Sequence, residues 1–297
     1  MSFKISHFSK EKLAELTVFM NTNHGLDNFT AKLLNEKIFD DPDFNTDLTV
    51  CSTCNGKLTG FGMAVLRQDG LGFIKLIAVG KDSRERGIGR AIYQVLEERL
   101  KIMGCRSIRV YNSNPNYLLP GVDPRYTPAL CLFNSLGFRR YGETLNMSVD
   151  LKKMKFQTSV NEKKLLKSGV SITRAKLSDG ERLISFMQSV FPLWVHEVKK
   201  MLSNDIITVF IASKDQEIIS FAGYDGNNIG AGWFGPMGTH TAHRGMGIGS
   251  LLFRICLKDM KKKYRKAVIP WVEPVCFYSR VSGAEVERLF WLYQKEI

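Results

Sequence analysis

The chain of 297 residues is about twice the common length of one domain, which predicts two domains. Its composition, 44% hydrophobic and 24% charged, is that of an ordinary globular protein, and no apolar run reaches the roughly 18 residues that span a membrane. The formal net charge of +13 suits any polyanion, including the phosphates of a coenzyme, and by itself selects none of them.

The N-terminus lacks the basic start, apolar middle and small-residue cleavage site of an export signal, so we expect the protein in the cytoplasm. Its six cysteines are then expected to be reduced thiols. Cys51 and Cys54 form one CxxC, and no second CxxC exists to complete a four-thiolate zinc site. We therefore expect no metal.

The first half alternates strand and helix patterns. An Asn55-Gly56 turn separates the first hairpin strands, and Gly104 ends a helix that follows the glycines at 87 and 89. In chain order the predicted elements are strands at 48–52, 57–66 and 71–79, a helix between 89 and 104, a strand at 107–111, a helix at 128–136 and a strand at 144–151.

A basic stretch with little periodicity follows, and we expect it to form a linker at 153–168 between domains at 1–152 and 169–297. Beyond it the pattern restarts with a strand at 172–177, a helix opened by a capping box at 178–181, strands at 206–213, 218–224 and 229–237, a helix at 247–262, a strand at 267–271, a helix at 275–281 and a strand at 286–294. The two halves therefore share one order of elements, which is an internal repeat at the scale of a domain.

One short signature occurs in both halves. Residues 84–89 and 244–249 match R-x-x-G-x-G, and each copy follows an apolar strand and opens an amphipathic helix. Glycines let the backbone approach a ligand, and the free N–H groups of a helix's first turn bind anions at the positive end of the helix dipole. The expected ligand is a pyrophosphate.

The spacing excludes two better-known phosphate loops. A dinucleotide-binding G-x-G-x-x-G would need a glycine in place of Ile92 or Leu252. A P-loop would need Gly-Lys-Ser/Thr, which the chain lacks.

These features resemble the GNAT acetyltransferase superfamily. Residues 76–89 and 237–249 each resemble that family's coenzyme-binding motif with its preceding strand, and residues 129–138 and 277–284 resemble its later A-x-x-x-Y-x-x-x-G-F helix. The resemblance covers both halves almost end to end. It implies an α/β fold with a mixed, splayed sheet in each of two tandem GNAT-like acyl-coenzyme A N-acyltransferase domains.

The resemblance implies an N-acetyltransferase that moves an acetyl group from acetyl-coenzyme A to an amine of a small molecule or peptide. A non-catalytic acyl-coenzyme A binding or sensing protein is the alternative, because neither half has every residue of the family pattern. A nucleic-acid-binding module would rest on the charge surplus alone, so we expect neither a specific nucleic acid nor a membrane as partner. The acceptor and the oligomeric state do not follow from the sequence.

The same resemblance implies that backbone N–H groups of a strand polarise the thioester and that each glycine turn holds the pyrophosphate. The implied coenzyme-binding residues are Ile77, Val79, Arg84, Arg86, Gly87, Ile88, Gly89 and Arg90 in the first half, and Met237, Thr239, Arg244, Gly245, Met246, Gly247, Ile248 and Gly249 in the second.

The catalytic residues implied by the resemblance lie in the second half. The family's tyrosine, which protonates the departing thiolate, is Phe133 in the first half, whereas the second half keeps Tyr278 with one extra residue before its glycine. His240, just after a predicted strand, is the candidate base. Two alternatives stay open: Tyr278 and His240 are structural, or Tyr117 or Tyr126 replaces the missing acid in the first half.

Acidic residues gather in the first half at positions 36, 40, 41, 43 and 47. Such a group attracts a cationic amine or is simply a solvated acidic loop, and we favour the second interpretation.

Overall fold

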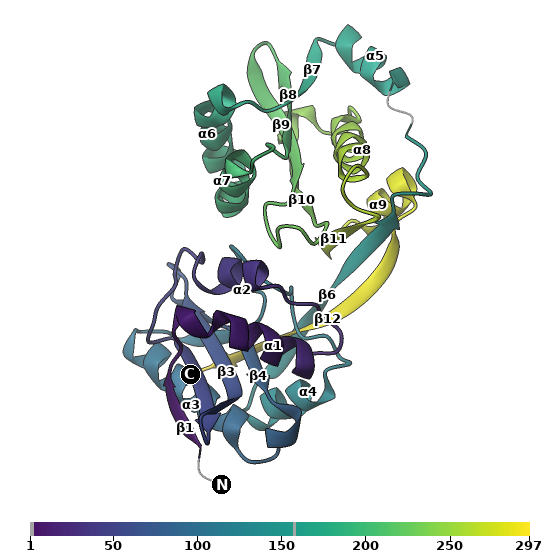
Figure 1. Ribbon diagram of the computed structural model, residues 1–297. Helices are drawn as coiled ribbons and strands as arrows, with labels where there is room; N and C mark the ends of the chain where they lie inside the picture. The colour runs from purple at the N-terminus through teal and green to yellow at the C-terminus, as the bar shows by residue number, and fades with distance from the viewer. Residues whose placement is uncertain (1–2, 157–158) are drawn as a thin grey trace. The chain divides into compact units, whose positions relative to one another are not determined.

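The computed structural model describes residues 3–156 and 159–297 and divides into two compact units (Figure 1). Unit 1 comprises Met1–Thr144 and Leu289–Ile297, and unit 2 comprises Leu145–Arg288. Residues 157 and 158, within the expected linker, lie outside the described residues, and helix α5 (Ser159–Lys167) follows them. Among the described residues, no helix is both long and apolar enough to cross a membrane.

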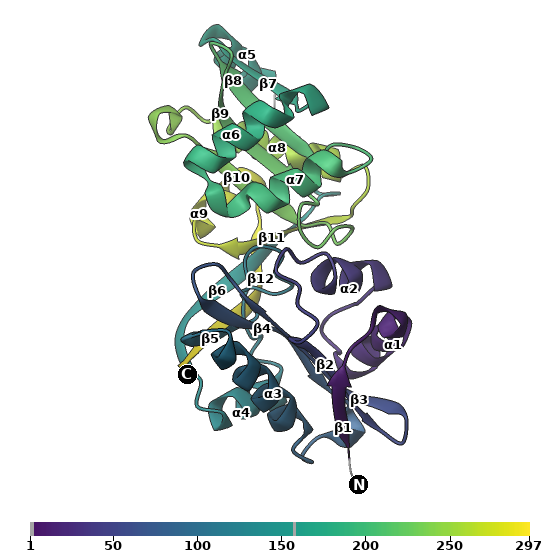
Figure 2. The same ribbon diagram turned by 90° about the vertical axis from the view of Figure 1, so that its left-hand side faces the viewer.

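Unit 1 is a mixed sheet with α1 and α2 on one face and α3 and α4 on the other (Figure 2). Its strands β1 to β5 lie side by side in chain order. The elements are β1 (Lys4–His7), α1 (Leu13–Asn23), α2 (Ala31–Ile38), β2 (Thr49–Cys54), β3 (Lys57–Leu66), β4 (Leu71–Val79), α3 (Ile88–Ile102), β5 (Ser107–Val110) and α4 (Thr127–Ser135).

Unit 2 repeats this plan, with α6 and α7 on one face of its strands and α8 on the other (Figure 1). The strands β10-β9-β8-β7 form one sheet in that order. The elements are β7 (Val170–Arg174), α6 (Gly180–Val190), α7 (Val195–Ser203), β8 (Val209–Lys214), β9 (Glu217–Tyr224), β10 (Phe234–Thr239), α8 (Ile248–Met260), β11 (Lys266–Val272) and α9 (Val275–Ser282). The predicted mixed α/β fold with two tandem domains is confirmed.

Two long strands, β6 (Arg139–Asp150) and β12 (Glu285–Glu296), belong partly to each unit. The end of β12 pairs antiparallel with β5 of unit 1, and the end of β6 pairs antiparallel with β11 of unit 2. The second half of the sequence thus provides β12, which extends the sheet of unit 1, and the first half provides β6, which pairs with β11 of unit 2. The compact units differ in this respect from a simple division of the chain at residues 153–168.

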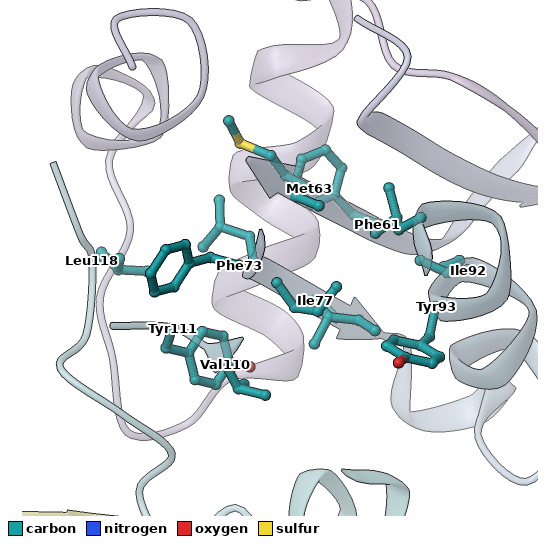
Figure 3. Packing of buried hydrophobic residues seen from close by; sticks show 14 of the residues in the cluster. Phe61, Met63, Phe73, Ile77, Ile92, Tyr93, Val110, Tyr111 and Leu118 are labelled. Atoms are coloured by element: carbon teal, nitrogen blue, oxygen red, sulfur yellow. The ribbon is translucent and has the colours of Figure 1, made fainter. Parts of the chain in front are cut away.

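The core of unit 1 lies between the sheet and its helices. Figure 3 shows Phe61 and Met63 of β3, Phe73 and Ile77 of β4 and Ile92 of α3, which all belong to one cluster of buried residues. Phe290, near the end of the sequence, is fully buried in the same core.

Candidate active site

The two glycine turns fold alike. Gly87 and Gly247 have φ angles of 79° and 83°, and helices α3 and α8 begin at the next residue. An added Cβ would meet no atom within 4 Å at either glycine, so the space beside both turns is open. Each turn therefore presents the free N–H groups of a helix N-terminus to an accessible space.

The arginine of each signature fastens its turn to the preceding strand. Arg84 Nε donates to the carbonyl oxygen of Val79 at 3.4 Å, and Arg244 Nε donates to that of Thr239 at 3.3 Å. Arg84 also donates to the carbonyl oxygen of Asn23 at 3.3 Å. Both side chains lie beside the predicted phosphate site and hold its backbone in place.

The strand N–H groups implied for thioester binding face the open side of β4. Gly80 N–H donates to the carbonyl oxygen of Thr59 in the neighbouring strand β3 at 3.0 Å, and the N–H groups of successive strand residues alternate in direction. Those of Ile77 and Val79 therefore point away from β3. The same argument applies in unit 2, where His240 N–H donates to Ile219 at 2.8 Å, so the N–H groups of Met237 and Thr239 point away from β9.

Strands β4 and β5 separate at a bulge. Their parallel pairing ends at Ile74 opposite Val110. On the other side of β4, Leu76 pairs with Met63 and Ile74 with Ala64, so Lys75 is the extra residue. Beyond it the two strands diverge, and the N–H groups of β4 are left without a neighbouring strand.

A cavity of about 860 Å³ opens where the strands diverge in unit 1. The predicted residues that line it are Ile77, Val79, Arg84, Gly87, Ile88, Gly89 and Arg90. Arg86 instead lines a separate cavity of about 370 Å³ together with Lys57. The unit 1 signature therefore contributes to two neighbouring spaces, and most of the predicted residues share the larger one.

The first-half helix residue Phe133 is fully buried against aromatic neighbours, as its apolar ring requires. Of the two alternative acids, Tyr126 lines the cavity, whereas Tyr117 is not among its lining residues. The Tyr126 hydroxyl donates to Asp27 Oδ2 at 2.7 Å, and its ring lies 5.4 Å from that of His24.

The cavity residues that were not identified from the sequence include His24 and Tyr111. His24 follows α1, and its burial lowers its pKa, an effect that Arg84 increases and the Asp27 carboxylate opposes. The imidazole is therefore neutral at physiological pH and able to accept a proton. Tyr111 immediately follows β5; its position at the end of a predicted strand beside a phosphate motif was the only sequence signal for it.

In unit 2 the Tyr278 ring packs 5.2 Å from Phe253 and 6.4 Å from Phe234, and burial raises the pKa of its phenol to about 12. His240 Nδ1 accepts a hydrogen bond from the backbone N–H of Ala242 at 3.3 Å. This bond leaves Nε2 as the nitrogen available to a ligand. Tyr278 and His240 stay predictions as the acid and base.

The interpretation of the acidic group as a solvated loop is wrong for Glu36 and Asp41, which are both buried. Asp41 forms ion pairs with Lys75 and, at 2.7 Å, with Arg67, and Glu36 pairs with Lys37 at 2.6 Å. Sequence alone did not reveal these partners because Arg67, just after β3, and Lys75, in β4, lie 26 and 34 residues away.

Several solved structures with similar folds each align over 99% of this chain. A GCN5-related glucosamine N-acetyltransferase region of a fungal multi-domain β-N-acetylglucosaminidase aligns with a TM-score of 0.83 at 19% identity, and the match covers 38% of that longer chain. A GCN5-related N-acetyltransferase from Sphaerobacter thermophilus aligns with a TM-score of 0.73 at 15% identity over 95% of its length. A tandem GNAT protein from the clavulanic acid biosynthesis pathway aligns with a TM-score of 0.70 at 14% identity over 98% of its length.

At these identities the similar structures show the fold alone. No curated protein matches the chain. The family model described as the acetyltransferase (GNAT) family matches residues 11–117 and 180–275, which is one match in each half of the sequence. With both matches spanning a glycine turn described above, the chain belongs to the GNAT acetyltransferase family as a tandem member.

Proposed function

We propose that the chain is an acetyl-coenzyme A-dependent N-acetyltransferase whose coenzyme binds in the cavity of unit 1. One observation carries this proposal: a single space of about 860 Å³ is bordered by strand N–H groups, a glycine turn and two side chains able to transfer protons, those of His24 and Tyr111. The acceptor is an amine of a small molecule or peptide.

The cavity residues fit the coenzyme. The first-turn N–H groups of α3 bind the pyrophosphate, and Arg90 in the same turn adds positive charge. Bound acetyl-coenzyme A supplies the activated acetyl thioester. The N–H groups of Ile77 and Val79 donate to the thioester oxygen, where negative charge develops as the amine attacks.

His24 is the proposed base in this cavity. Its imidazole is neutral at physiological pH, and its loop borders the same space as the end of β4. A neutral imidazole accepts the proton that the amine loses when it attacks the acetyl carbon.

Turnover of acetyl-coenzyme A with a broad panel of amines tests the proposal. We expect acetylation of at least one amine by the wild-type chain and none by Gly87→Asp, whose carboxylate would occupy the pyrophosphate position. Coenzyme binding without acetylation of any amine would favour the sensing alternative.

The second glycine turn supports a coenzyme site in unit 2 as well, because its backbone matches that of unit 1. Tyr278 and His240 would then act there as the sequence predicts. If Gly247→Asp silenced acetylation and Gly87→Asp did not, catalysis would belong to unit 2.

A further inference from the structure

Unit 1 has no hydroxyl group at the helix position where the family pattern has its tyrosine. Phe133, at the corresponding helix position, carries none and is fully buried. Its ring packs edge-on against Tyr111, with the centroids 6.3 Å apart and the planes at 88°. Tyr293 also packs on Phe133, with the centroids 6.5 Å apart, but of these two tyrosines only Tyr111 lines the cavity.

Tyr111 lies at the point where the strands separate. It is the first residue after Val110, the last residue of β5 paired with β4, and it lines the cavity together with Ile77. Figure 3 shows Tyr111 next to Val110 at the border of the core. Because Ile77 provides one of the proposed thioester-binding N–H groups, the Tyr111 side chain borders the space that receives the thioester.

The backbone of Tyr111 is strained, which indicates a specific role. Its φ angle of 70° lies in the left-handed region, where an aromatic residue is a rare outlier. Its own N–H donates to Ile74 at 2.9 Å, and its carbonyl accepts from Ser113 N–H at 2.6 Å, so both sides of the residue are held. Strain of this kind is typical of residues that a functional site must position.

The Tyr111 hydroxyl has no hydrogen-bond partner among the residues described, although the residue is only 8% exposed. A buried phenol normally has such a partner. Tyr126, in the same cavity, differs because its hydroxyl already donates to Asp27. The unused Tyr111 hydroxyl is thus available to a ligand in the cavity.

We propose that Tyr111 is the proton donor of the unit 1 site, in place of the hydroxyl that Phe133 lacks. This role rests on the proposed function. The amine nitrogen forms a bond to the acetyl carbon as the carbon–sulfur bond breaks. The electron pair of the carbon–sulfur bond passes to sulfur. Sulfur takes the Tyr111 proton, while His24 takes the proton lost by the amine. Burial, aided by the Asp27 charge, raises the pKa of Tyr111, so its proton is retained at neutral pH until sulfur becomes basic.

Tyr111→Phe tests this role because it removes the hydroxyl and keeps the ring that packs on Phe133. We expect kcat and kcat/KM for acetyl transfer to fall together by about 10- to 1000-fold, since water substitutes for part of the missing acid. The calorimetric Kd for coenzyme A and the thermal unfolding midpoint should stay at the wild-type values. Tyr141→Phe is the matched control from the same unit, because Tyr141 is 46% exposed and does not line the cavity, and this variant should keep full activity.

Two results would overturn the inference. One is wild-type kcat for Tyr111→Phe in an enzyme that binds coenzyme and acetylates an amine, which leaves the proposed function intact. The other is a lower kcat that follows only from weaker coenzyme binding or an earlier unfolding transition, because that pattern indicates packing. A wild-type chain without acetyl transfer would instead refute the proposed function and, with it, the role of Tyr111.

Discussion

Asp41 is the centre of a group of buried charges in unit 1, with Lys75 and Arg67 as its partners. Burial alone would raise the pKa of Asp41, but the two cations hold it below its ordinary value. Burial also lowers the pKa of Lys75, to about 7, against the opposing attraction of Asp41. Because Lys75 is the bulge residue of β4, this group of charges anchors the strand where the cavity begins.

We predict that Asp41→Asn destabilises unit 1 by about 3–5 kcal/mol at pH 7, because it leaves buried cations without their partner. The double variant Asp41→Asn/Lys75→Met should recover part of this loss, as urea unfolding in a double-mutant cycle would measure. The folded-state pKa of Asp41 is lowered, so its stabilisation is complete above its unfolded pKa of about 4 and disappears as pH falls through the folded value. An Asp41→Asn chain as stable as the wild type would contradict this account.

A second prediction concerns His24 and pH. A base must be deprotonated, so kcat/KM should be constant at neutral pH and fall as the pH drops through the lowered pKa of His24. His24→Gln should remove this acid limb and reduce kcat/KM about 10- to 1000-fold. The measurement needs an acceptor amine that stays uncharged over the range. An unchanged acid limb in His24→Gln would assign the titration to another group.

At this scale the sequence predicted the backbone groups of the site better than its side chains. The R-x-x-G-x-G spacing located Gly87 and Gly247 because local backbone geometry depends on neighbouring residues. The roles of His24 and Tyr111 depend instead on where a loop and a strand end lie in the folded unit. No local pattern contains that information.

Among the elements, the glycine turns with their helices are the most closely repeated. Arg84 N–H donates to Lys81 at 3.4 Å, and Arg244 N–H donates to Thr241 at 3.3 Å, so the short 3-10 turns before both helices match. Two such turns predict two coenzyme sites.

We therefore predict that the wild-type chain binds two equivalents of coenzyme A in calorimetric titration. Gly87→Asp and Gly247→Asp should each bind one, because a carboxylate replaces the anion and a side chain is strained at φ angles of 79° and 83°. One equivalent for the wild type, lost in only one of the two variants, would restrict binding to that unit.

Element boundaries were predicted best where turn chemistry is local. The Asn55-Gly56 hairpin is confirmed, with φ angles of 50° and 75°. The capping box expected at 178–181 is wrong, since α6 begins at Gly180 and the Asp179 carboxylate accepts from Lys176 N–H instead. Helix α5 lies within the stretch expected to form a linker, because a weakly periodic sequence can still form a helix against α8.

On the scale of the whole molecule, the repeat was evident from the sequence, but the exchange of β6 and β12 was not. Alternation of apolar residues predicts a strand and gives no information on the strand with which it pairs. Each strand was expected to belong to the domain formed by its own half of the sequence.

The exchange predicts that substitutions late in the sequence impair the first unit. Phe290→Ala removes a fully buried ring from the unit 1 core and should cost about 3–5 kcal/mol. Coenzyme binding at the Gly87 turn should weaken as that unit loses order. Val286→Ala, on the same strand at a residue that is 56% exposed, is the control and should leave both properties unchanged. Equal effects of the two substitutions would contradict the observed pairing of β12.

The pairing of β12 with β5 also sets the order of events when the protein is made. Residues 3–138 leave the ribosome long before residues 289–297, so β5 keeps an unpaired edge until the last strand has been synthesised. An apolar strand edge exposed for so long is open to association with other nascent chains. The sheet of unit 1 is thus completed only after β12 has been synthesised. A stop in translation before β12 leaves a first half that contains its coenzyme motif but not the strand that completes its sheet.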